Sequence, residues 1–412
     1  MRRLTVPVIA FAALASAGSL LGQEKQATGP HGTVLHRENV RVETRDGVEL
    51  ATDVFRPTEG GRVVGRPLPA LLHRTPYDRT RAGLREQARY FASHGYVVVL
   101  QDTRGRYASG GEFRKYNSND APDGHDAVEW VASLPYVADV VGMWGTSYGA
   151  HTQADAAKTN PPHLGTIVPN MGGIANGWTH KVRNHGALEL AQQLGWAFSQ
   201  LPAGSEDPVV RERFERVSVV DWFDAVPFRR GLNPLSVAPN FEDYFLEMQT
   251  HGDYDGYWKR IGVNWEEYYE KTADIPMLHV GGWYDSYAAG TVQSFQELAR
   301  LKDSSMHLIM GPWTHGQNDR PHAGDVAFGP EAALRNFDRE FHLRWFDHHL
   351  KGEETEAAQM SSVRIFVMGT GDGHRTEEGR IFHGGYWREA SAWPLLEAKA
   401  TRFYLRKGGG LT

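Results

Sequence analysis

The chain has 412 residues, of which 41% are hydrophobic and 23% charged, and its formal net charge at pH 7 is −6. This length and composition predict a globular protein with a large core and about two or three domains. The mild acidic charge, without a basic run interleaved with aromatic residues, argues against nucleic acid as a partner. The sequence contains no cysteine, which excludes disulfides and acylation on cysteine.

Residues 1–22 have the layout of a secretory signal peptide. Two arginines at positions 2–3 precede an apolar stretch at 4–14, and small residues follow at 15–19. The apolar stretch is short for a bilayer span. We therefore predict an exported protein, periplasmic or extracellular, with no stable membrane anchor after cleavage of the signal peptide.

Residues 36–171 alternate between strand and helix patterns. Residues 40–55 are expected to form a β-hairpin, with Asp46-Gly47 as a type I′ turn. Beyond it, the pattern predicts strands at 70–72, 96–100, 140–144 and 166–168, and helices at 84–93, 123–133 and 150–158. Strands separated by helices predict right-handed βαβ units and a parallel sheet.

This alternation stops between residues 172 and 274 and resumes over 275–370. In the interrupted part, aromatic and acidic residues follow helical spacing at 188–198, 209–214, 244–248 and 265–269, which we interpret as an inserted helical cap. After it, the pattern predicts strands at 276–280, 306–310 and 363–368, and helices at 291–301 and 331–349. The sheet therefore consists of two sequence segments with a helical insertion between them.

The pentapeptide Gly145-Thr146-Ser147-Tyr148-Gly149 joins a predicted strand to a predicted helix. A serine on such a tight turn has a strained backbone and projects its hydroxyl above the sheet, and the glycines avoid collisions across the turn. The next residue offers its backbone N–H to a developing oxyanion at a helix N-terminus. Ser147 is therefore the predicted nucleophile and Tyr148 an oxyanion donor. An ordinary glycine-rich turn is the alternative.

A nucleophilic serine needs a base, and the base needs an acid to orient it. In doubly wound hydrolases the acid and then the histidine follow the serine in the chain, in loops at strand ends. Asp285 follows the strand at 276–280, and His315 follows the strand at 306–310. We predict that these residues complete a catalytic triad. A helix N-cap is the alternative role for Asp285, and His322 is the alternative base.

The loop after the strand at 70–72 contains no glycine run that could donate backbone N–H groups to an oxyanion. Tyr77, placed by the rigid Pro76, could donate its phenolic O–H instead; a surface tyrosine is the other interpretation. Trp144, Trp178 and Tyr287 are predicted to line the substrate pocket. No metal-ligand spacing occurs, and no metal or cofactor is expected.

Several stretches carry a family pattern: Arg74 to Tyr77, Gln101 to Arg106, Ser109 to Gly111, Asp123 to Asp126 with Glu129-Trp130, Gly145 to Gly149, Gly281 to Asp285, and Gly311 to His315. With these stretches the chain resembles the family that groups cocaine esterase, α-amino-acid ester hydrolases, glutaryl acylases and X-Pro dipeptidyl peptidases. The resemblance implies an α/β-hydrolase fold, a doubly wound and mostly parallel sheet with an inserted helical cap, and normally a C-terminal jelly-roll domain. It implies Ser147, Asp285 and His315 as the triad and Tyr77 and Tyr148 as the oxyanion hole.

The chain departs from the family at two places. In α-amino-acid ester hydrolases acidic residues after the triad aspartate help bind the substrate ammonium, whereas Asp285 is followed by Ser286-Tyr287-Ala288-Ala289. This difference argues against selectivity for a free α-amino group. Residues 371–412 are expected to be a linker and, at 400–405, the first strand of a C-terminal β domain that is truncated here.

The sequence thus predicts a secreted serine hydrolase that cleaves small-molecule carboxylic esters, or amides, through an acyl-enzyme. An X-Pro dipeptidyl peptidase and a β-lactam or glutaryl-type acylase are the near alternatives. A non-catalytic binding protein on a hydrolase scaffold is the alternative from another class, because a fold alone does not establish function. The sequence does not determine the substrate or the oligomeric state.

Overall fold

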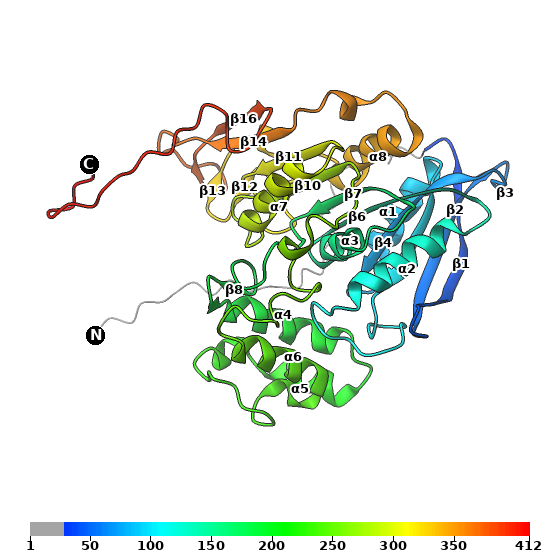
Figure 1. Cartoon of the computed structure of the whole chain (residues 1–412), viewed down its shortest axis with the longest axis horizontal. Coiled ribbons are helices and arrows are strands. Elements are labelled where there is room, and N and C mark those ends of the chain that lie inside the picture. Colours follow the sequence, from blue (N-terminus) through cyan, green and yellow to red (C-terminus); the bar gives the residue numbers. More distant parts are fainter. Residues whose placement is uncertain (1–28) are drawn as a thin grey trace.

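The computed structural model describes residues 29–412 (Figure 1). The predicted signal peptide at 1–22 lies outside the described residues. Among residues 29–412, no helix has both the length and the apolar character needed to span a bilayer. The chain folds around one 11-stranded sheet with helices on both faces, and a separate group of helices lies beyond one end of the strands (Figure 1).

The large sheet is parallel in its middle and antiparallel at both edges. Its strand order is β1-β2-β5-β4-β6-β7-β10-β11-β14-β16, with β3 paired to β2. All neighbours from β5 to β14 are parallel, whereas β1, β2 and β16 pair antiparallel. The bounds are β1 Gly32–Glu43, β2 Glu49–Glu59, β3 Arg62–Val63, β4 Leu68–Thr75, β5 Val97–Asp102, β6 Val137–Thr146, β7 Leu164–Asn170, β10 Met277–Gly282, β11 Met306–Gly311, β14 Val363–Met368 and β16 Gly385–Ala390.

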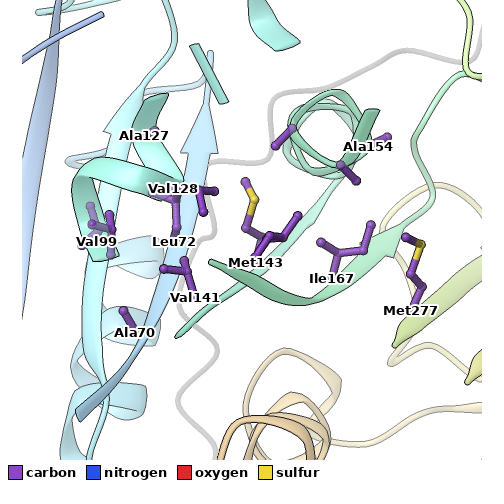
Figure 2. Close-up of a cluster of buried hydrophobic side chains, with 14 of the residues drawn as sticks. Ala70, Leu72, Val99, Ala127, Val128, Val141, Met143, Ala154, Ile167 and Met277 are labelled. Carbon is purple, nitrogen blue, oxygen red and sulfur yellow. The ribbon is translucent and has the colours of Figure 1, made fainter. Parts of the chain in front are cut away.

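Both faces of the sheet are buried under helices. Three helices cover one face, α2 (Asp120–Ala132), α3 (Tyr148–Lys158) and α7 (Ala288–Leu301); α1 (Ala82–Ser93) and α8 (His342–Lys351) cover the other. The first four residues of β5 are therefore all apolar, because Val97 and Val99 pack on the first face while Val98 and Leu100 pack on the second. Figure 2 shows part of the first cluster, with Val99 and Leu72 close to Val128 of α2. Full burial of each such side chain contributes about 1.5–3 kcal/mol to stability.

The segment between β7 and β10 is mostly helical and has its own core. Leu194, Phe245 and Trp258 are buried in this core, which also includes Tyr148 and Tyr287 from the sheet side. The helical segment is therefore packed directly onto the strand ends around Ser147. The predicted division of the chain at 36, 172, 275 and 371 stays a prediction. The elements in this segment are β8 Arg183–Asn184, β9 Ala187–Leu188, α4 Leu190–Ala203, α5 Pro208–Arg216, α6 Pro239–Thr250 and the 3-10 helices Val219–Trp222, Pro234–Val237 and Glu266–Tyr268.

Three local predictions are wrong. The single helix expected at 331–349 starts only after Asn336, whose backbone is left-handed (φ 54°); a π-helix at Phe337–Phe341 then leads directly into α8 at His342. The helix expected at 265–269 is only a 3-10 helix of three residues, Glu266–Tyr268. The turn at Asp46-Gly47 is not type I′: of these two residues only Gly47 has a positive φ, 82°.

Residues 371–412 contain more structure at their start, and less at their end, than predicted. Strand β16 extends the large sheet, and β15 (Ile381–Phe382) joins a small sheet with β12 (His322–Ala323) and β13 (Val326–Ala327). Residues 400–405 form no strand; Leu405 makes one isolated bridge to Leu411 and is 87% exposed. A strand without a neighbour has no backbone partners to stabilise it. The truncation of a C-terminal domain stays a prediction.

Candidate active site

Ser147 lies on a sharp turn between β6 and α3. Its φ of 63° and ψ of −120° form a strained conformation for a residue with a side chain. The turn requires glycine at the neighbouring positions, because the backbone approaches there leave no space for a side chain. A Cβ on Gly145 would lie 3.0 Å from the Gly149 backbone, and a Cβ on Gly172 would collide with the Ser147 carbonyl oxygen. The predicted serine turn is therefore present, and Ser147 is partly exposed at its top.

Asp285 and His315 lie in the loops that follow β10 and β11, two adjacent parallel strands. His315 Nδ1 is 3.1 Å from both carboxylate oxygens of Asp285. The carboxylate also accepts the Ser286 hydroxyl and the Tyr287 N–H, each at 3.3 Å. Asp285 is 1% exposed at its side chain, whereas His315 is 33% exposed. The aspartate is thus buried and accepts several hydrogen bonds. The histidine ring beside it is partly exposed to solvent.

The geometry bears on two alternatives from the sequence. Asp285 does not occupy the N-cap position of α7, because that position belongs to Tyr287. His322 belongs to β12, and the Asp285 carboxylate pairs with His315 instead. Asp285 and His315 are therefore a specific pair.

The glycines that end the two strands allow the loops after them to pack closely. A Cβ on Gly282 would collide with the Trp313 carbonyl, and a Cβ on Gly311 would collide with the Trp313 indole. Trp313 can therefore pack beneath both loops, where it is fully buried. Gly316, next to His315, lies against Thr146, next to Ser147: the separation between a Gly316 Cβ and Thr146 Cγ2 is 3.8 Å. Nε2 is the ring nitrogen of His315 that remains for the serine, because Nδ1 faces Asp285.

Tyr77 approaches the serine from the loop after β4. Burial raises the pKa of Tyr77, and hydrogen bonds with Trp196 and Ser147 oppose this rise. Trp196 Nε1 donates to the Tyr77 phenolic oxygen at 3.1 Å. Since this oxygen already accepts a hydrogen bond, its own proton is available to donate toward Ser147 or a group bound there.

Buried arginines hold the Tyr77 loop in place. Arg79 donates to Asp102 at 2.7 Å from its backbone and at 2.6 Å from its guanidinium. Arg106 Nε donates to the carbonyl of Pro76 at 2.8 Å. Asp102 and Arg106 come from the stretch at 101–106 that carries the family pattern, so this stretch fixes the loop that carries Tyr77.

Tyr148 is held by its side chain while its backbone faces the serine turn. It is the first residue of α3, so its N–H has no partner within the helix. Its hydroxyl donates to Asp120 at 2.7 Å and accepts the Tyr116 N–H at 2.8 Å. The Tyr148 ring stacks on the Tyr116 ring with 5.5 Å between centroids. The backbone N–H is therefore placed rigidly beside Ser147.

The three predicted pocket residues have different surroundings. Tyr287 stacks on His315, with ring centroids 5.7 Å apart, and so lies beside the triad. Trp178 lies in the helical segment, where Nε1 donates to the Gly252 carbonyl. Trp144 is buried in the core beneath α1 and α8, against Phe91. Of the three, Tyr287 contacts His315, whereas Trp144 packs in the core on the side of the sheet that α1 and α8 cover.

Beneath the serine turn lies a buried acidic cluster that the sequence does not reveal. Possible ligand atoms of Asp120, His151 and Asp155 lie within 4.8 Å of one another. Lys158 Nζ donates to Asp155 at 2.6 Å, which supplies the positive charge that the cluster needs. Burial, together with the charge of Asp155, raises the pKa of Asp120 to about 7. We assign this network to the support of α3 and Tyr148.

Sequence reasoning also missed four side chains around the triad: Trp196, Tyr116, Lys115 and Lys181. Tyr116 contacts the hydroxyl of Tyr287, with 3.3 Å between oxygens. These residues belong to the loops and helices that cover the strand ends, where no local motif marks a functional residue. Only their packing reveals their position.

Comparison with known proteins identifies the family. The model of the X-Pro dipeptidyl-peptidase (S15) family matches residues 46–317, more than half of the chain. The chain belongs to this family. It is 30% identical over 385 residues to cocaine esterase from Rhodococcus sp. (strain MB1 Bresler), a match that covers 90% of this chain and 62% of the esterase. A putative serine esterase from Mycobacterium bovis is 26% identical over 428 residues, covering 90% of this chain and 63% of the relative. The chain thus spans less than two thirds of the length of these relatives.

Solved structures agree with the predicted fold. An α-amino acid ester hydrolase superposes with a TM-score of 0.66 at 23% identity, covering 98% of this chain and 66% of that one. A CocE/NonD family hydrolase from Staphylococcus aureus superposes with a TM-score of 0.63 at 19% identity, covering 90% of this chain and 58% of that one. The predicted family resemblance and the α/β-hydrolase fold are therefore confirmed.

Proposed function

We propose that this chain is a serine hydrolase that cleaves carboxylic esters, or amides, through an acyl-enzyme. The observation that carries the proposal is the Asp285–His315 pair, with 3.1 Å from Nδ1 to each carboxylate oxygen, beside a serine on a strained turn. This constellation is the one that nucleophilic serine chemistry requires. Membership of a hydrolase family and the likeness to cocaine esterase support it.

In this mechanism His315 Nε2 takes the proton of Ser147 as the hydroxyl oxygen attacks the substrate carbonyl. Asp285 stabilises the imidazolium that forms and holds Nδ1–H in the correct tautomer. The Tyr77 O–H and the Tyr148 N–H stabilise the tetrahedral oxyanion. His315 then protonates the leaving group, and water repeats the sequence on the acyl-enzyme. Because the Tyr77 loop and α3 are held by buried contacts, both donors are oriented before the reaction begins.

The surroundings of Asp285 favour an ester without a free α-ammonium over an X-Pro dipeptide. None of the residues 286–289 carries a carboxylate. Instead, the ammonium of Lys181 donates to the Ser286 hydroxyl at 2.9 Å. A cation at this position repels a substrate ammonium, so a peptidase that requires a free N-terminus is disfavoured.

The test compares substrates with the purified chain: a 4-nitrophenyl ester, an X-Pro-nitroanilide and a β-lactam side-chain amide. We expect kcat/KM for the ester to exceed that for the X-Pro substrate by about 100-fold or more. The protein should also react with a fluorophosphonate at one serine. A chain that reacts with neither the substrates nor the fluorophosphonate would instead be a binding protein. Preferred turnover of the X-Pro substrate would make it a peptidase.

Replacing Tyr77 with phenylalanine should lower kcat on the ester by about 10²–10³-fold with a smaller change in KM, the usual effect of losing one oxyanion donor. The substitution keeps the ring and removes only the O–H. Tyr269→Phe is the matched control, because Tyr269 is also buried and its hydroxyl meets only the Ser294 hydroxyl, at 3.0 Å. A decrease of less than about threefold for Tyr77→Phe would remove Tyr77 from the mechanism.

We further propose that the protein is exported, on the basis of the residue pattern at 1–22. The mass of the protein recovered from the periplasm or the medium tests this: a mature chain should lack about the first 20 residues. Retention of these residues in a cytoplasmic protein would contradict it.

A further inference from the structure

Two lysines are buried beside the candidate active site. Lys115 is 4% exposed and Lys181 is 6% exposed. Lys115 Nζ donates to the Gln193 amide oxygen at 2.8 Å, and Lys181 Nζ donates to the Ser286 hydroxyl at 2.9 Å. Within the described residues 29–412, neither ammonium forms an ion pair, in contrast to the buried Lys158, which pairs with Asp155.

Each ammonium group lies against an aromatic ring that contacts a residue of the candidate site. Lys181 Nζ lies 3.8 Å from the centroid of the Tyr287 ring, which stacks on His315. Lys115 Nζ lies 4.3 Å from the centroid of the Trp196 ring, whose Nε1 donates to Tyr77. One cation is therefore next to the base, and the other is next to the oxyanion donor.

Gln193 connects the two lysines. Its amide oxygen accepts from Lys115, and its Nε2 donates to the Lys181 carbonyl at 2.7 Å. We call Lys115, Lys181, Gln193 and Ser286 the lysine cradle. Ser286 is the exposed member of the cradle, and it connects the buried Lys181 ammonium to the protein surface.

The cradle has more hydrogen-bond donors than acceptors. Each ammonium carries three N–H donors, and each has one neutral oxygen as its acceptor. Burial lowers the pKa of Lys181 to about 8, although Asp285 and Glu189 oppose this effect, and burial lowers the pKa of Lys115 as well. A buried ammonium without an ion-pair partner is costly, and an anion that binds beside it lowers this cost.

We propose that the lysine cradle binds a carboxylate of the substrate, so that the preferred substrates are esters or amides carrying a negative charge near the scissile bond. This inference rests on the proposed hydrolase function and names its substrate class. The carboxylate belongs either to the acyl part, as in a monoester of a dicarboxylic acid, or to the leaving group, as in an acylated hydroxybenzoate. The charge in the cradle attracts either one and places the carbonyl at Ser147.

The experiment compares charged substrates with capped substrates of the same shape. In the first arm, 4-nitrophenyl monoesters of the dicarboxylic acids from adipic to suberic acid are compared with their methyl-capped diesters. In the second arm, 4-acetoxybenzoate is compared with its methyl ester. In the wild type we expect a ratio of kcat/KM, charged over capped, above about 10 in one arm, and that arm identifies the part that carries the carboxylate.

Lys181→Met and Lys115→Met remove the charge and keep most of the side-chain volume. Each should lower the charged-over-capped ratio by about 10-fold. Lys271→Met is the matched control, because Lys271 is exposed on the helical segment, and its ratio should equal that of the wild type. A wild-type ratio near one in both arms, or equal losses on charged and capped substrates in both cradle variants, would overturn the proposal.

A second measurement needs no variant. The wild-type ratio should fall as the pH rises through about 8, because Lys181 then loses its charge. The other charged groups facing Lys181 are Asp285 and Glu189, which raise its pKa, and Lys115, which interacts with it repulsively. Effects of pH on the catalytic groups cancel in the ratio. A ratio that stays constant from pH 7 to about 9 would contradict the cradle.

The two proposals fail in different ways. Turnover of the capped esters without a preference for charge would remove only the lysine cradle. A chain that cleaves no ester and does not react with a fluorophosphonate would remove the hydrolase function itself.

Discussion

Ser147→Ala is expected to lower kcat on a 4-nitrophenyl ester by about 10⁵–10⁶-fold, because no other group can form the acyl-enzyme. Fluorophosphonate labelling should disappear at the same time. The residual rate, still above that in water, would come from the oxyanion donors Tyr77 and Tyr148. Alanine at φ 63° is as strained as serine, and Gly145 and Gly172 still leave the turn its space, so the unfolding temperature should stay close to that of the wild type.

The control for this variant is Ser133→Ala. Ser133 is an exposed serine at the end of α2, and its hydroxyl donates only to the Trp130 carbonyl. It should keep full turnover and labelling. If Ser147→Ala still reacts with the fluorophosphonate, the nucleophile lies elsewhere and the triad is wrongly assigned.

Asp285→Asn is expected to lower kcat by about 10⁴-fold while the protein stays folded. Asparagine has the shape of aspartate and can still accept from Ser286 or Tyr287. Its amide N–H₂, however, opposes His315 Nδ1–H, so the imidazole turns to the wrong tautomer and its cation loses its counterion. The measurement is kcat and KM on the same ester; KM should change far less than kcat.

The chain offers a matched control in a second aspartate–histidine pair. His251 Nδ1 lies 2.7 Å from Asp255, on the surface of the helical segment. Asp255→Asn makes the same chemical change and should leave kcat within about twofold of wild type. Equal losses in both variants would mean that Asp285 acts only on stability. An active Asp285→Asn enzyme would assign another acid to His315.

The positions of the triad residues were predictable because each is tied to a local pattern. A buried strand, a glycine that no other residue could replace and a polar residue follow one another at β6, β10 and β11. Because carboxyl ends of parallel strands share one edge of the sheet, three separate loops could be expected to meet. The roles of Ser147, Asp285 and His315 stay proposals until the variants are measured.

Trp144 shows where this reasoning stops. Residues 141–145 of β6 are buried on both faces, so their sequence is apolar without alternation, and nothing local indicates which face a given residue occupies. The structure buries Trp144 under α1 and α8, while Met143 points to α2 and α3. The prediction of one long helix at 331–349 was wrong because the pattern of polar and apolar residues does not reveal the left-handed backbone of Asn336.

By itself the sequence determined the family, the mostly parallel sheet, the interruption between β7 and β10, and the serine turn with its two partner loops. The family resemblance depends on the motif stretches, and the other features depend on periodicity and on glycines, which act over a few residues. Only the tertiary structure decided that Trp196 meets Tyr77, 119 positions away, and that Lys181 meets Ser286, 105 positions away. Burial and the lack of an ion-pair partner are properties of packing, which the sequence does not show. For this reason Lys115 and Lys181 look like ordinary surface charges in the sequence and are candidate binding groups only in the structure.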